Sequence, residues 1–181
     1  MRVKSLVSVA FVAAPLTMLG VNAGAEEFFG KFSGFEEVGP LNAETGAIFS
    51  PGTATVSLDL NRNAKTITFK LSYSGLSAPV TQAHIHFGKR HVPGGIMVFF
   101  CTNLNNGPAG TQPCPQGTAT VTGMFTGASV VGPTAQHVTA GDFDALVAAL
   151  ESDTAYGNIH TTNFPAGEIR AQIREHDRDE R

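Results

Sequence analysis

Residues 53–73 read TATVSLDLNRNAKTITFKLSY, and this stretch decides the fold class. On each side of the central NRNA, apolar residues fill every second position, from Ala54 to Leu60 and again from Ile67 to Tyr73. Successive side chains of a strand point to opposite faces, so the pattern indicates two strands that each bury one face. The stretch therefore predicts a β-hairpin with one face in a core and the other in water.

Six other stretches have the composition of strands and are separated by turn residues. They span residues 28–35, 82–87, 95–101, 117–125, 154–161 and 167–174. Residues 96–100 are apolar on both faces, which predicts a central strand buried between two layers rather than an edge strand. One helix is expected, because residues 139–142 have the form of a capping box and apolar residues follow at helical spacing. The whole pattern predicts an all-β, antiparallel sandwich or barrel with one short helix.

The first 25 residues have the layout of a secretory signal peptide. Basic residues precede an apolar run that ends at Leu19, and the small residues Ala23-Gly24-Ala25 offer a cleavage site after Ala25. Pro15 and Gly20 interrupt the apolar run, so no stable membrane anchor is expected. The expected location of the protein is therefore secreted or periplasmic.

The remainder is expected to form one β-sandwich domain, residues 26–174, followed by a charged and disordered tail, residues 175–181. The chain carries 12 basic and 15 acidic residues, and this balance argues against nucleic acid as a partner. The two cysteines, Cys101 and Cys114, are expected to form one disulfide in an exported chain, with two buried free thiols as the alternative.

Two histidines stand two residues apart in QAHIHFG, residues 82–88. On a strand, His84 and His86 point to the same side, with their Cα atoms about 7 Å apart. Rings at that separation can converge on one metal ion or on one carboxylate.

A second group of polar side chains lies near the C-terminus. In YGNIHT, residues 156–161, three polar residues share one strand face, and the strand after it has the same pattern. A hairpin folded about Phe164 would then place these side chains opposite one another in three pairs, which are His160 with Glu168, Asn158 with Arg170, and Tyr156 with Gln172.

Four segments together resemble the CHRD domain, a family named from chordin: FSGFEEV (32–38), AHIHFG (83–88), YGNIHT (156–161) and PAGEIRAQ (165–172). The resemblance implies an exported domain with an immunoglobulin-like or superoxide-dismutase-like antiparallel β-sandwich or barrel. The animal members bind growth factors, but the family has no agreed biochemical activity. The HIH motif also looks like the first copper-binding strand of copper-zinc superoxide dismutase. The rest of that enzyme's signature is missing here, so dismutase chemistry is not expected.

Two functions are compatible with these residues. The first is a non-catalytic binding or structural module of the envelope or extracellular space, with another protein as partner. In that case the polar residues form a buried network that fixes the register of the sheet.

The second function is a transition-metal protein, with copper or zinc bound and redox activity open. Its expected ligands are His84, His86 and His160, with Glu168 as a ligand or as the partner of one. The polar network around them comprises Tyr156, Asn158, Arg170 and Gln172. His91 follows closely enough to be a further ligand. An enzyme is the least favoured interpretation, because no nucleophile occupies a recognisable elbow.

Overall fold

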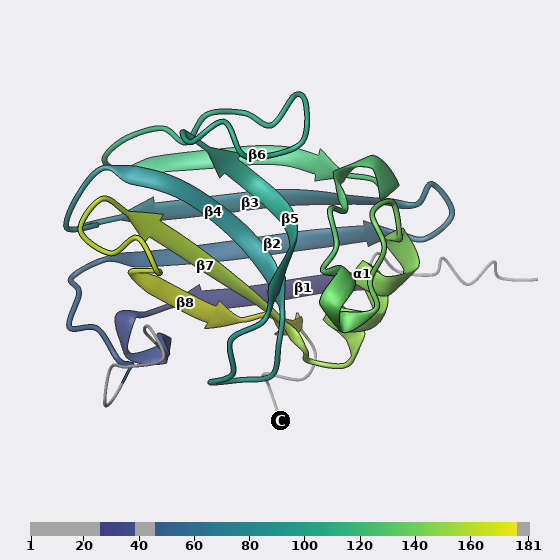
Figure 1. The fold of residues 1–181 in the computed structure, drawn as a ribbon, viewed down its shortest axis with the longest axis horizontal. Coiled ribbons are helices and arrows are strands. Elements are labelled where there is room, and N and C mark those ends of the chain that lie inside the picture. Colours follow the sequence, from purple (N-terminus) through teal and green to yellow (C-terminus); the bar gives the residue numbers. More distant parts are fainter. Residues whose placement is uncertain (1–25, 39–45, 177–181) are drawn as a thin grey trace, which may run out of the picture.

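Strands β2 (Thr53–Asn61) and β3 (Thr66–Ser74) form the predicted hairpin in a computed structural model that describes residues 26–38 and 46–176. The alternating apolar positions of both strands are buried, and most of the polar ones are exposed. The hairpin belongs to an antiparallel five-stranded sheet with the order β6-β3-β2-β1-β9 (Figure 1). The other strands of this sheet are β1 (Glu26–Phe32), β6 (Ala119–Phe125) and β9 (Arg174–Glu175).

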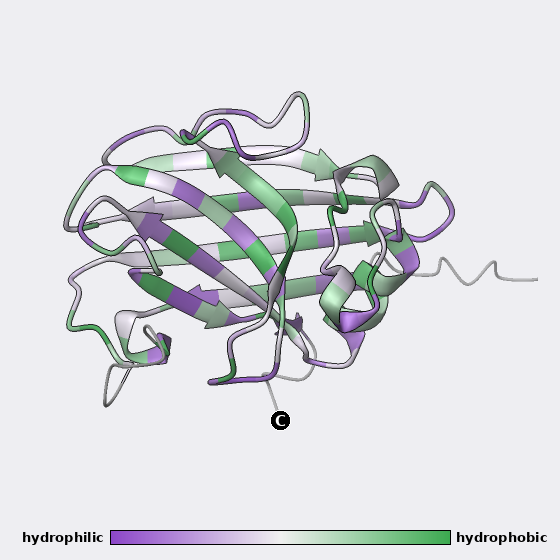
Figure 2. Cartoon of the chain, in the orientation of Figure 1, coloured by the Kyte–Doolittle hydropathy of each residue, from purple (hydrophilic) through white to green (hydrophobic). Residues whose placement is uncertain are grey.

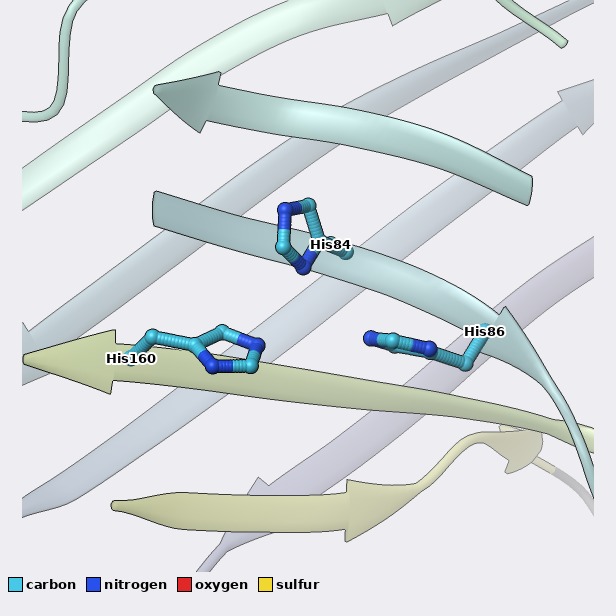
Figure 3. A group of neighbouring side chains, drawn as sticks. All are labelled: His84, His86 and His160. Atoms are coloured by element: carbon cyan, nitrogen blue, oxygen red, sulfur yellow. The ribbon is translucent and has the colours of Figure 1, made fainter. Parts of the chain in front are cut away.

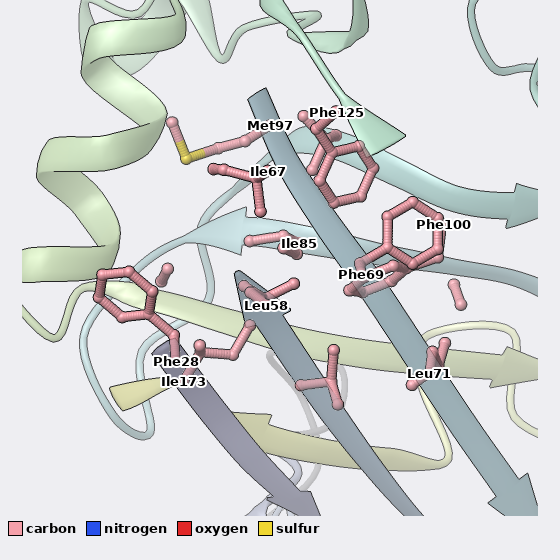
Figure 4. Close-up of a cluster of buried hydrophobic side chains, with 14 of the residues drawn as sticks. Phe28, Leu58, Ile67, Phe69, Leu71, Ile85, Met97, Phe100, Phe125 and Ile173 are labelled. Carbon is pink, nitrogen blue, oxygen red and sulfur yellow. The ribbon is translucent and has the colours of Figure 1, made fainter. Parts of the chain in front are cut away.

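A second, four-stranded antiparallel sheet has the order β5-β4-β7-β8. Its strands are β4 (Val80–Phe87), β5 (Gly95–Thr102), β7 (Ala155–Thr161) and β8 (Ile169–Gln172). The two sheets stack face to face, and their apolar side chains meet between them in a core that includes Phe28, Leu58, Phe69, Ile85 and Phe100 (Figure 4). Colouring by hydropathy shows the alternation along the strands (Figure 2). The all-β sandwich with one helix is therefore confirmed.

Helix α1 (Phe143–Glu151) lies at one end of the sandwich (Figure 1). Its N-cap is Asp142, whose carboxylate accepts a hydrogen bond from the backbone N–H of Ala145. The apolar face of the helix, which includes Leu146 and Leu150, is buried in the core. Three short 3-10 turns, η1 (Gly34–Glu36), η2 (Gly127–Ser129) and η3 (Thr134–Gln136), complete the described elements.

Strand β5 lies at the edge of the four-stranded sheet, so the prediction of a central strand there is wrong. Its apolar residues are still largely buried, because the chain after β6 runs along this edge. The N–H of Val131 donates to the carbonyl of Met97, and the N–H of Gly95 donates to the side chain of Gln136. An apolar run on both faces can thus mark an edge that is covered by a loop segment.

The chain termini are only partly described. The predicted signal peptide, residues 1–25, lies outside the described residues. Glu175, placed in the disordered tail by the sequence, pairs with Phe28 in β9, while residues 177–181 lie outside the described part. The predicted disulfide between Cys101 and Cys114 is confirmed. None of the helices in the described ranges has the length and apolar character needed to cross a membrane.

The two sheets approach each other closely at Gly157 of β7. A Cβ atom added to this glycine would collide with the far end of the Phe32 ring, which is buried in the core. The glycine therefore makes room for an aromatic ring from the facing sheet, at the strand that also carries Tyr156 and Asn158.

We expect Gly157→Ala to destabilise the domain by about 1–3 kcal/mol, because the added methyl overfills a packed core. Phe32→Leu removes the ring atoms that the methyl would meet, so Gly157→Ala should cost clearly less in a Phe32→Leu background. Chemical denaturation of the four proteins in this cycle measures the coupling. Strictly additive effects would contradict this packing.

Candidate metal centre

Three buried histidines lie together on the face of the four-stranded sheet that points away from the core (Figure 3). His84 and His86 come from β4, and His160 comes from the neighbouring strand β7. Between the first two, Ile85 points into the core, as the period of a strand requires. The ring centroid of His84 lies 5.3 Å from that of His86 and 5.0 Å from that of His160. The predicted placement of both HIH rings on one face is thus what the structure shows.

The three rings can each offer one nitrogen to a common point. These nitrogen atoms all lie within 4.8 Å of one another. An equilateral triangle with that side has its centre about 2.8 Å from each corner, against about 2.0–2.1 Å for a zinc–imidazole bond. A shift of each ring by less than about 1 Å would therefore bring all three into bonding distance of one ion.

Hydrogen bonds to backbone carbonyls orient two of the rings. Nδ1 of His86 lies 3.0 Å from the carbonyl oxygen of Gly94, and Nδ1 of His160 lies 3.0 Å from that of Pro165. A carbonyl oxygen can only accept, so each Nδ1 carries the proton and each Nε2 presents a lone pair. This is the arrangement that fixes the tautomer of metal-bound histidines.

Four ring nitrogens of the cluster have no hydrogen-bond partner among the described residues. They are Nε2 of His86, Nε2 of His160 and both ring nitrogens of His84. A buried polar atom without a partner costs about 1–3 kcal/mol. The cluster therefore differs from a satisfied structural network, because its unpaired atoms are those that converge.

Burial also keeps the three rings neutral. Desolvation, with smaller contributions from the neighbouring rings, lowers the pKa of His84 to about 2 and the pKa of His86 to about 4. Burial lowers the pKa of His160 as well. Neutral imidazole is the form that binds a metal, so near pH 7 the lone pairs are not occupied by protons.

Tyr156 separates His86 from a buried cation. The rings of Tyr156 and His86 stack with centroids 4.7 Å apart, and the guanidinium carbon of Arg170 lies 3.4 Å from the Tyr156 centroid. Because β7 lies between β4 and β8, the two groups contact opposite sides of the Tyr156 ring. The N–H of Gly94 donates to the hydroxyl of Tyr156, so one residue holds both the ring of Tyr156 and that of His86.

Arg170 is held by the loop between β4 and β5, where it donates to the carbonyls of Lys89 and Val92. The carboxylate of Glu37 offsets its charge, with a smaller contribution from Glu36. Glu37 accepts a hydrogen bond from Asn158, which lies directly opposite His84 in the β4–β7 ladder. Burial raises the pKa of Glu37 to about 7 even though Arg170 opposes the shift. Sequence reasoning missed this residue, whose one signal was its place in the FSGFEEV segment.

The predicted pairing of β7 with β8 is confirmed for Tyr156 with Gln172 and for Asn158 with Arg170. The described ladder ends at the pair of Ile159 with Ile169, so Glu168 precedes it.

The structure does not bring the Glu168 side chain to the histidines. Gly167 has a φ of 129°, a conformation that favours glycine, and the chain turns there before β8 begins. The buried Glu168 carboxylate accepts hydrogen bonds from Ser50, Ser77 and Thr161 instead. Those bonds hold its pKa below the usual range despite burial. Ser77 is exposed at a bend, and both its backbone N–H and its hydroxyl donate to this carboxylate.

The remaining predicted residues lie around the cluster rather than in it. Gln172 donates to the carbonyls of Gly88, Asp153 and Ala155. His91 is exposed and faces Glu36, with 3.1 Å between its Nε2 and the carboxylate. The ring of Phe99 meets that of His84 edge-on at a centroid distance of 4.5 Å.

The structure is an antiparallel β-sandwich with a histidine-bearing face, which is the type of domain that the sequence resemblance implies. The model of the CHRD domain matches residues 28–173, so the chain belongs to the CHRD domain family. No curated protein and no solved structure matches the chain.

The metal-free protein should lose stability as the pH falls below about 6.5. The unfolded chain then protonates its histidines, while the folded chain keeps His84 and His86 neutral. His84→Leu removes one such group, so from pH 7 to pH 5 the variant should lose about 2 kcal/mol less than the parent. Glu37, whose raised pKa acts in the opposite direction, is present in both proteins and cancels in the comparison. Urea denaturation at the two pH values measures this, and parallel pH dependences would refute it.

Proposed function

We propose that this CHRD domain is a transition-metal binding protein whose ligands are His84, His86 and His160. The observation that carries the proposal is the convergence of their unpaired, buried nitrogen atoms within 4.8 Å. Imidazole nitrogen suits copper and zinc among the common transition metals. Carbonyl bonds to the opposite ring nitrogens of two rings support the same conclusion, because they hold the lone pairs toward the shared point.

The nearby cation does not rule out a metal. Arg170 lies behind the ring of Tyr156, and its charge is opposed by Glu37. A bound ion would therefore be separated from the guanidinium by an aromatic ring, rather than share the site with it.

Export through a signal peptide to a secreted or periplasmic location is part of the proposal. The layout of residues 1–25 and the disulfide between Cys101 and Cys114 support it, because disulfides persist in oxidising compartments.

A structural or protein-binding role for the domain is the second candidate. Phe35 and Phe49 favour it, because they are 65% and 93% exposed and contact each other edge-to-face on the surface. Exposed aromatic side chains in contact are typical of surfaces that bind another protein. This role and metal binding use different parts of the chain and are separated by the experiment below.

The protein exported through its own signal should hold about one copper or zinc ion per chain by elemental analysis. The double variant His84→Ala/His86→Ala should hold no metal, because only one of the three histidine ligands remains. The matched control is His91→Asn/His137→Asn. Both residues lie outside the cluster, and asparagine tolerates their positive φ angles of 58° and 61°.

Retention of metal by the control and its loss from the cluster variant would support the metal site. If the parent holds no metal even after incubation with copper and zinc, and the cluster variant is strongly destabilised, the cluster is a structural polar core. The search for function would then move to protein partners.

A further inference from the structure

The donor set of the histidine cluster carries no negative charge. Among the described residues, the group that could hold an ion contains three histidines and neither a carboxylate nor a thiolate. Glu168 is held by Ser50, Ser77 and Thr161. Both cysteines are joined in the disulfide. Every charge that an ion brings to this site would therefore stay uncompensated by its ligands.

The site is also screened from water. His84, His86 and His160 are 0%, 9% and 7% exposed. The cost of moving an ion from water into such a place grows with the square of its charge, so it is about four times larger for a divalent ion than for a monovalent one. The guanidinium of Arg170, behind Tyr156, adds a repulsion that is again larger for the divalent ion.

The number of donors points the same way. Zinc in proteins is almost always four-coordinate, with at least three protein ligands and a water or substrate in any open position. Phe99 contacts His84 edge-on and Tyr156 stacks on His86, so aromatic rings rather than charged donors border the cluster beside these two histidines. Cu(I), with its lower charge, is stable with two or three neutral donors, so the three imidazole nitrogens can complete its coordination.

We infer that the site selects monovalent copper, held as a three-coordinate Cu(I) ion by His84, His86 and His160, over divalent zinc. The inference rests on the proposed function and names the ion for the same site. It assigns to the domain a role in holding reduced copper, with no change of oxidation state at the site.

The test is a pair of competition titrations on the metal-free full chain at pH 8. Cu(I) is supplied anaerobically against bicinchoninate, and Zn(II) is supplied against a chromogenic zinc chelator. We expect one Cu(I) per chain and an affinity for Zn(II) weaker by about a hundredfold or more. Zn(II) bound as tightly as Cu(I) would overturn the selectivity and leave the proposed function standing. Failure of both ions to bind would overturn both.

A second variant tests the cause without removing a ligand. Glu37→Gln keeps the size of the side chain and removes the negative charge that offsets Arg170 at pH 8. It should weaken binding of both ions, and the change in log affinity for Zn(II) should be about twice that for Cu(I), because electrostatic energy is proportional to the charge of the ion. An equal change for the two ions would contradict the charge argument. The urea midpoint of the variant shows that it is folded.

Discussion

The register of β7 against its two neighbours is the constraint on which the rest of the structure depends. All seven residues of this strand are buried, so both of its faces have a fixed environment. Gly157 and Ile159 face the other sheet, while the side chains of Asn158 and His160 face the loops. A slip by one residue would move the polar side chains into the core and the apolar ones into the polar layer. Core and candidate metal site are therefore specified together.

Polar side chains from distant segments hold this register through several hydrogen bonds each. Arg170 binds two loop carbonyls, Gln172 binds three, and the Glu168 carboxylate accepts bonds from three residues. Buried polar groups in proteins are normally satisfied in this way. The unpaired nitrogens of His84 and His160 depart from that rule on the same sheet face. Four unpaired nitrogen atoms gathered in one cluster are a cost in stability, and such a cost is the pattern expected where function, rather than folding, keeps a residue.

The parts of the fold and site that the sequence predicts are those set by local periodicity. Alternation fixes the β2–β3 hairpin and the shared face of His84 and His86, and one turn fixes the β7–β8 register. The errors have a different origin. The position of β5 at an edge depends on a segment some 30 residues later, and the direction of Glu168 depends on the turn at Gly167. Likewise, no pattern marks the Gly94 carbonyl as a partner of His86, because every residue has a carbonyl.

The overall charge of the chain says little about the ion that the site accepts. The chain is acidic, with a formal net charge of −3, yet Glu26 and Glu36 bind arginines at the surface. Surface charges are screened by water and salt, whereas buried charges are screened much less. Among the buried charges near the histidines, Arg170 acts on His86, and Glu37 acts on Arg170. One cation, one anion and three neutral rings supply no net negative charge to compensate a bound ion. The fold therefore accommodates an ion of low charge better than one of high charge.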